Sequence, residues 1–166
     1  LSSDILDLAG RPREGRFVDP FAGTGVVSRE AAVRGWPVLA NDLLPSASAL
    51  TRAQLSTRAE ARFATLGGHK TAIGLLNAAP PHLGVFSREY APGKQDAGRR
   101  YFTDENAQRI DGMRALLAEW SRRGLLTTVE RTLLLGDLIQ ATNAVANTAG
   151  TYGCYLRKFA PNALRP

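Results

Sequence analysis

The residues best suited to chemistry lie in one short stretch, where an acidic side chain is followed by a turn with two glycines. This stretch reads Phe17-Val18-Asp19-Pro20-Phe21-Ala22-Gly23-Thr24-Gly25. Glycine accepts φ > 0 and carries no Cβ, so such a turn lets a ligand approach the backbone closely. The apolar pair before the turn predicts a strand, and residues 26–34 after it predict a helix that stops at Gly35. The first N–H groups of that helix would face any ligand on the turn.

A second acidic group stands about 20 residues beyond the glycines, where a nucleotide-binding sheet holds a ribose diol. Residues 36–40 predict a second strand, and Asn41 and Asp42 stand at its end. The alternative is that Asp42 only caps the helix expected from Ser46. Ser28 replaces the third glycine of a dinucleotide fingerprint, and the sequence lacks a Gly-Lys-Ser/Thr phosphate loop. Neither of those two ligand classes is therefore indicated.

Composition favours a globular protein with a nucleic-acid partner. The chain has 21 Lys and Arg against 15 Asp and Glu, and the excess is larger beyond Leu83. Most of these basic residues are arginine, whose guanidinium group can donate two hydrogen bonds to one phosphate. The alternative is an ordinary basic surface. No apolar run approaches the ~18 residues that a membrane span needs. The single cysteine, Cys154, excludes an internal disulfide and fits the cytoplasm.

The elements predict an α/β chain: part of a Rossmann-like sheet, followed by a largely helical region. Residues 1–68 form the first region, with a short helix at the start and another over residues 46–66, capped by Ser46 and ended by Gly67-Gly68. Its expected core contacts are Leu50, Leu55, Ala59, Phe63 and Leu66. Residues 69–102 are rich in glycine and proline, so we expect mainly loop there.

Residues 103–166 predict two helices and a shaped turn. Thr103 opens the first helix and Gly124 ends it, with Ile110, Met113, Leu117 and Trp120 on one face. The second begins near Thr128, and its expected inward side chains are Val129, Leu133, Ile139, Thr142 and Val145. Asp137 is expected to be exposed on it. The glycines, amides and tyrosines of residues 147–158 predict the turn.

Arginines alternate with aromatic residues around residues 87–90 and 99–102. This mixture suits phosphate contact and base stacking, and it equally suits an exposed loop. The candidate DNA contacts are Arg88, Arg99, Arg100, Arg157 and Lys158.

Three stretches resemble the adenine-specific DNA methyltransferases of the Dam-like α group, which use S-adenosylmethionine (SAM). They are residues 19–25 with Asn41 and Asp42, residues 101–111, and residues 147–158. The first is common to many SAM enzymes, and the other two are more particular. The resemblance implies SAM as cofactor, double-stranded DNA as substrate, and a helical DNA-recognition insert in a restriction–modification enzyme.

The same resemblance implies which residues contact SAM. Asp42 would bind the ribose, and Asp19 would organise the ammonium at the methionine end. The alternative for Asp19 is that it accepts N–H groups of its own turn. The full implied cofactor set is Asp19, Pro20, Phe21, Ala22, Gly23, Gly25, Asn41 and Asp42.

The sequence lacks the family's catalytic segment, Asp/Asn-Pro-Pro-Tyr/Phe, which holds the flipped adenine. Pro80-Pro81 follows Ala79 and precedes His82, so it has neither the acid nor the aromatic ring. We therefore expect no catalytic residue here, and a chain inactive alone. The segment would come from a second polypeptide, as in a split enzyme, or from sequence beyond Pro166.

Other chemistry is not indicated by the remaining residues. His69, His82 and the distant Cys154 make no metal set. Two alternatives to the methyltransferase part remain. One is a non-catalytic module that binds DNA or a partner, and the other is a SAM-dependent enzyme that acts on RNA or a small molecule.

Overall fold

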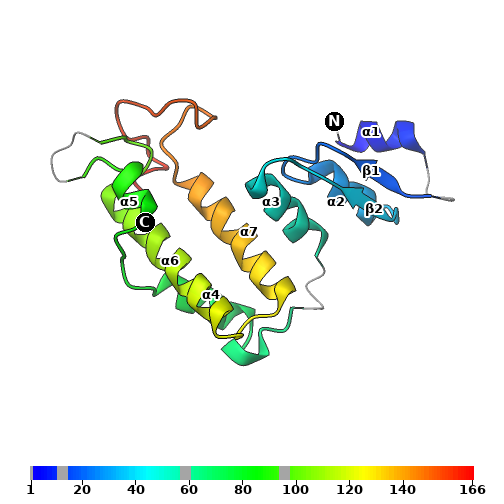
Figure 1. Cartoon of the computed structure of the whole chain (residues 1–166). Helices are drawn as coiled ribbons and strands as arrows, with labels where there is room; N and C mark the ends of the chain where they lie inside the picture. Colours follow the sequence, from blue (N-terminus) through cyan, green and yellow to red (C-terminus); the bar gives the residue numbers. More distant parts are fainter. Residues whose placement is uncertain (1, 11–14, 57–60, 94–97) are drawn as a thin grey trace. The chain divides into compact units, whose positions relative to one another are not determined.

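A computed structural model describes residues 2–10, 15–56, 61–93 and 98–166 of the chain. The described part is mixed α/β, with seven α-helices and one two-stranded parallel sheet (Figure 1). Two compact units make up the chain: Leu1–Arg62 with Thr128–Gly136, and Phe63–Thr127 with Asp137–Pro166. Each unit has buried side chains of its own. No described helix combines the length and the apolar character needed to cross a membrane.

The first unit is built on the predicted strand, glycine turn, helix and second strand. β1 (Phe17–Asp19) pairs in parallel with β2 (Val38–Ala40), and α2 (Val26–Val33) connects them and packs on both. Val18 lies opposite Leu39, and these side chains are 56% and 51% exposed. One face of the sheet is thus open in the described chain, whereas parallel sheets normally have both faces covered.

A short helix at the start of the chain is tied to α2 by one arginine. α1 (Ser2–Ala9) confirms the predicted helix, and its Leu6 is fully buried. Arg34 Nη1 lies 2.6 Å from Asp7 Oδ1, and its Nη2 donates to Ser3 Oγ at 2.8 Å. Its Nε also pairs with Glu30 of α2 at 3.2 Å. The guanidinium therefore joins the two helices.

The helix after β2 is shorter than predicted. α3 (Pro45–Leu55) starts with Pro45 in its first turn, where the missing N–H costs nothing, so Ser46 is not the cap. It ends at Leu55 and not at Leu66, and predicted contact Ala59 lies outside the described residues. Phe63 is buried as predicted, but its backbone is not helical. Its φ is 49°, and it directly precedes the short 3-10 helix η2 (Ala64–Leu66).

The second unit is organised around α6 (Asp104–Arg122), as predicted. The Thr103 side chain accepts the Asn106 N–H at 3.1 Å, and Asp104 and Glu105 lie in the first turn, where acids favour the helix dipole. Ile110, Leu117 and Trp120 are buried on it.

The expectation of a loop over residues 69–102 is wrong in part. α4 (His69–Asn77) and α5 (Val85–Glu89) form there, and both pack against α6 (Figure 1). Gly112 of α6 admits the intervening Pro80-Pro81 segment, because a Cβ at Gly112 would lie 2.3 Å from the Pro80 carbonyl oxygen.

The last helix, α7 (Thr128–Ala144), begins where predicted but buries other residues. The expected inward set, Val129, Leu133, Ile139, Thr142 and Val145, is only half-buried. The buried positions are Glu130, Thr132, Leu134, Gly136 and Leu138, so one-face periodicity predicted the wrong positions. Asp137 is exposed, as predicted.

Three asparagines fasten the end of the chain within the second unit. Asn147 is fully buried, and its side-chain amide donates to the carbonyls of Arg100 and Leu156 at 2.9 Å. Asn106 Nδ2 donates to Ala163 O at 3.0 Å, and Asn162 Nδ2 donates to Ala146 O at 3.0 Å. The Asn147 amide therefore closes the predicted turn over residues 147–158, and the other two amides hold the chain on either side of it.

Candidate cofactor site and nucleic-acid interface

The two glycines of the turn differ in what surrounds the position of a Cβ atom. Gly23 has φ +56°, and no described heavy atom lies within 4 Å of where its Cβ would stand. Gly25 has φ +81°, and its Cβ would lie 2.7 Å from Thr51 Cα on α3. Thr51 Oγ1 donates to Gly23 O at 3.1 Å. The missing Cβ leaves open space at Gly23, whereas at Gly25 it makes room for α3. Whether either glycine contacts a ligand stays a prediction.

Asp42 closes the turn by accepting two backbone N–H groups. Its Oδ2 accepts from Gly23 N at 2.8 Å, and its Oδ1 accepts from Leu44 N at 2.9 Å. The Leu44 N–H and then the Gly23 N–H hold the pKa of the Asp42 carboxyl below its usual value. The side chain therefore stays charged near neutral pH, and each oxygen keeps a second lone pair for another donor.

Asp19 is held by the residue that replaces the third glycine of the fingerprint. The buried Ser28 hydroxyl donates to Asp19 Oδ2 at 2.6 Å. The alternative predicted that the Asp19 carboxylate accepts N–H groups of its own turn. Among the described residues, the donor to this carboxylate is the Ser28 hydroxyl of α2. The Asp19 carbonyl accepts from Asn41 N at 2.8 Å, which extends the strand pairing to the strand ends.

Further contacts join the turn to the end of β2. Ala22 N donates to Asn41 O at 2.9 Å, and Asn41 Nδ2 donates to Pro20 O at 3.2 Å. Phe21 projects outward with 88% of its surface exposed. The structure thus brings the whole predicted cofactor set to the carboxyl ends of two parallel strands. This edge is where open α/β sheets bind ligands.

A hollow of about 400 Å³ adjoins this edge, between β2 and α3. Asn41 and Asp42 line it, together with Ser48, Thr51 and Arg52 of α3. Sequence reasoning missed these three α3 residues, because their helix shows no motif. They give the hollow hydroxyl groups and one cation beside the two strand-end residues.

In the second unit, tyrosines and arginines form a continuous array. The Arg99 guanidinium lies 5.8 Å from the Tyr90 ring centroid, and the Tyr90 and Tyr101 rings are 5.8 Å apart. Tyr101 also stacks on Tyr152 at 6.1 Å and meets the edge of Tyr155 at 5.2 Å. The arginine–aromatic alternation in the sequence is therefore a contiguous surface in the fold.

The predicted DNA contacts are only partly gathered there. Arg100 Nη1 donates to the Arg157 carbonyl at 3.0 Å, so residues 99–100 lie against the turn that carries Arg157 and Lys158. Arg88 belongs to α5, where its Nη2 donates to Leu83 O at 3.1 Å. The side chains of Arg157 and Lys158 are exposed.

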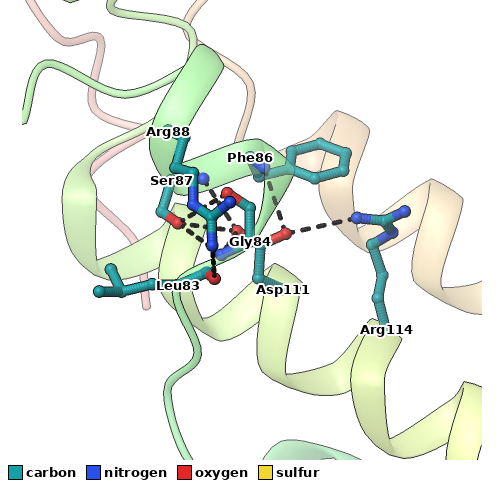
Figure 2. Close-up of polar contacts among 7 residues, drawn as sticks. All are labelled: Leu83, Gly84, Phe86, Ser87, Arg88, Asp111 and Arg114. Atoms are coloured by element: carbon teal, nitrogen blue, oxygen red, sulfur yellow. Dashed lines mark hydrogen bonds and ion pairs between the residues drawn. The ribbon is translucent and has the colours of Figure 1, made fainter.

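Sequence reasoning missed a buried carboxylate beneath α5 (Figure 2). Asp111 of α6 has a side chain only 1% exposed, and it accepts the N–H groups of Gly84, Phe86 and Ser87 at 3.0, 3.2 and 2.9 Å. The Ser87 hydroxyl donates at 2.9 Å, and Arg114 Nη1 lies 3.3 Å away.

Gly84 is necessary for this arrangement, because its Cβ would lie 2.5 Å from Asp111 Cγ. Burial raises the pKa of the Asp111 carboxyl, but the hydrogen bonds from Ser87, Phe86 and Gly84 together hold it below its usual value. The sequence did carry one signal for this site. Asp111 directly follows Ile110, which the periodicity places on the buried face of the helix.

Comparisons with known proteins agree with these features. The family model of "D12 class N6 adenine-specific DNA methyltransferase" matches residues 1–165. Type II methyltransferase M.NlaIII of Neisseria lactamica is 30% identical over 167 residues, covering 100% of this chain and 48% of that protein. Type II methyltransferase M.FokI of Planomicrobium okeanokoites is 34% identical over 153 residues, covering 89% of this chain and 23% of that protein.

Modification methylase LlaI of Lactococcus lactis subsp. lactis is 32% identical over 154 residues, covering 90% of this chain and 24% of that protein. The chain thus spans about half the length of M.NlaIII and about a quarter of the other two. No solved structure matches. The match along nearly the whole chain establishes that it belongs to the D12 class of N6 adenine-specific DNA methyltransferases.

Proposed function

We propose that this chain is the SAM-binding and DNA-recognition part of a site-specific DNA adenine methyltransferase. The observation that carries the proposal is the polar edge of the sheet, where Asp42 ties the glycine turn to the end of β2. A charged carboxylate there suits the hydroxyls of a ribose, and Asp19 suits the positive methionine end of SAM. The neighbouring hollow lies within the size range of ligand pockets, roughly 300–1,000 Å³.

The catalytic half of the enzyme is proposed to lie outside these 166 residues, on another polypeptide or on additional sequence. The exposed Val18 and Leu39 support this, because a parallel sheet with one open face has apolar surface to cover. The absence of an Asp/Asn-Pro-Pro-Tyr/Phe segment from the sequence supports it too. That same absence favours the second candidate, a non-catalytic module that binds DNA or a partner.

We expect SAM to bind more tightly when the catalytic half is present, because only part of its pocket is formed here. Asp42→Asn should weaken that binding roughly 10- to 150-fold, since a hydrogen bond to a charged acceptor contributes about 1.5–3 kcal/mol. Calorimetric titration with SAM measures both effects. The amide introduced by this substitution still offers an oxygen to the Gly23 N–H, but its NH2 group cannot accept the Leu44 N–H. The free energy of unfolding of Asp42→Asn is therefore measured beside its SAM affinity.

Asp7→Asn is the matched control for this titration, because Asp7 is an exposed acid of the same unit whose partner is Arg34. It should leave SAM affinity unchanged. Equal SAM affinity of Asp42→Asn and the wild type would remove the ribose role. Transfer of a labelled methyl group from SAM to an adenine-containing duplex by the chain alone would overturn the need for a catalytic half.

The arginines of the tyrosine array are proposed to hold the DNA backbone. Replacing Arg99 and Arg100 by alanine should weaken binding to all duplexes alike, because phosphate contacts carry no sequence information. Each lost phosphate contact should flatten the slope of log affinity against log salt by about 0.9, so up to ~2 for the pair. Fluorescence anisotropy across a salt series measures this slope.

The double variant Arg122→Ala/Arg123→Ala removes the same charge from the exposed end of α6. This double variant should lower DNA affinity less than the Arg99 and Arg100 replacement does. It should leave the slope of log affinity against log salt nearly unchanged. If both double variants change the slope equally, the effect is general charge and the array is not the DNA surface.

A further inference from the structure

Arg114 is fixed from two sides while half of its side chain faces solvent. Its Nη1 lies 3.3 Å from Asp111 Oδ1, its guanidinium carbon lies 5.2 Å from the Phe86 ring centroid, and 47% of the side chain is exposed (Figure 2). Both supports are themselves fixed. Asp111 is bound by three backbone N–H groups and a hydroxyl, and Phe86 packs edge-on against the buried Phe102 at 5.4 Å.

Phe86 also joins Arg114 to the array that carries the proposed DNA contacts. The Phe86 and Tyr90 rings are 5.8 Å apart, and Tyr90 lies under Arg99. Arg114 therefore lies at one end of a run of aromatic rings whose other end is the 147–158 turn. A duplex held along this surface by its phosphates would lie next to the guanidinium of Arg114.

Arg114 differs electrostatically from the arginines proposed to hold phosphates. Arg99 contacts a tyrosine ring, and Arg88 contacts a carbonyl oxygen, and both of these partners are uncharged. Arg114 instead shares its charge with a carboxylate, which weakens its attraction for phosphate. With Nη1 held by Asp111 and its guanidinium beside the Phe86 ring, this planar side chain keeps further N–H donors for another acceptor. Fixed, supported geometry is what base recognition requires, and the commonest specific contact is an arginine fork on O6 and N7 of guanine.

We infer that Arg114 is a specificity-determining residue that forks onto one guanine in the major groove of the DNA, and that Asp111 is the residue that positions it. The inference rests on the proposed function, since it requires a duplex on the array. It adds a base-reading position to a surface that otherwise holds the backbone. Lysine cannot replace Arg114, because an ammonium group lacks the planar fork.

Selection from a pool of duplexes with a randomised central segment tests this inference, using the 166-residue chain alone and joined to its catalytic half. The wild-type chain should enrich a sequence with a required guanine. Arg114→Lys should lose the preference at that guanine by roughly 5- to 150-fold and keep the preferences elsewhere. Asp111→Asn should lower the same preference, a change that destabilisation alone does not produce at a single base position.

Arg122→Lys is the matched control, because Arg122 lies on the same helix and pairs with Glu119 at the same spacing of three residues, away from the aromatic rings. It should leave the selected sequence unchanged. If the wild type binds DNA and Arg114→Lys keeps every preference, the inference is overturned and the proposed function stands. A uniform loss of affinity on all duplexes also overturns it, since Arg114 would then hold phosphate. A wild-type chain that binds no duplex, alone or completed, overturns both.

Discussion

Asp111→Ala is expected to destabilise the second unit by about 3 kcal/mol. The substitution removes the acceptor of the Phe86 and Ser87 N–H groups, whereas the Gly84 N–H keeps a second acceptor in Ser87 Oγ at 2.9 Å. Each N–H group left unsatisfied costs about 1–3 kcal/mol unless water reaches it. Urea unfolding followed by NMR measures the effect, because the two tryptophans lie one in each unit. The indole signal of the buried Trp120 reports the second unit, and that of Trp36 reports the first.

Asp137→Asn is the control for this prediction, since Asp137 is an exposed acid of the same unit that lies 3.4 Å from His69. Exposed pairs contribute about 0–1 kcal/mol, so its effect should be small. A loss below about 1 kcal/mol in Asp111→Ala would mean that other contacts hold α5 in place.

The acid dependence of stability follows from the same carboxylate. Its folded pKa is lower than its ordinary value, so the ionised group stabilises the fold fully above an unfolded pKa of about 3.9. That contribution is lost as the pH falls from there through the folded pKa. The Asp111→Ala unit should therefore show a shallower loss of stability below pH ~4 than the wild type, with no difference in slope between about pH 5 and 8.

Local signals explain what the sequence could predict. Gly25 and Gly35 bound α2, and Thr103 with Gly124 bounds α6, because a left-handed glycine or a capping hydroxyl acts within one helical turn. The position of the strand-end residues could be predicted in the same way. A glycine turn after one parallel strand and an acidic residue after the next strand lie at the same edge of the sheet. Whether they bind SAM stays a prediction.

The misread elements depend on contacts between distant residues. α5 has five residues and is held by Asp111, which lies 24 to 27 positions away from its partners. The glycine content of residues 69–102 predicts a loop, yet Gly74 lies inside α4, because a glycine within a helix costs only about 1 kcal/mol. Phe63 continued the apolar pattern of α3, but its side chain is buried from a non-helical backbone. Periodicity alone does not separate these cases.

Gly25→Ala is expected to destabilise the first unit by about 3 kcal/mol, and Gly23→Ala by only about 1 kcal/mol. Both residues have φ > 0, which costs an alanine about 1–2 kcal/mol. At Gly25 the new Cβ would also lie 2.7 Å from Thr51 Cα, a backbone atom, so α3 must move, and such overpacking adds about 1–3 kcal/mol. At Gly23 no described atom opposes the methyl group.

Urea unfolding followed by the Trp36 indole signal measures both variants, and Gly23→Ala serves as the matched control for the backbone cost. The two variants should also separate in function. Gly25→Ala moves α3, and with it the Thr51 and Arg52 side chains of the hollow, whereas Gly23→Ala places a methyl group directly on the open side of the turn. Gly23→Ala should therefore weaken SAM binding more than its small stability loss explains. Equal stability losses in the two variants would mean that α3 adapts freely, and that the close approach of Thr51 does not set the identity of residue 25.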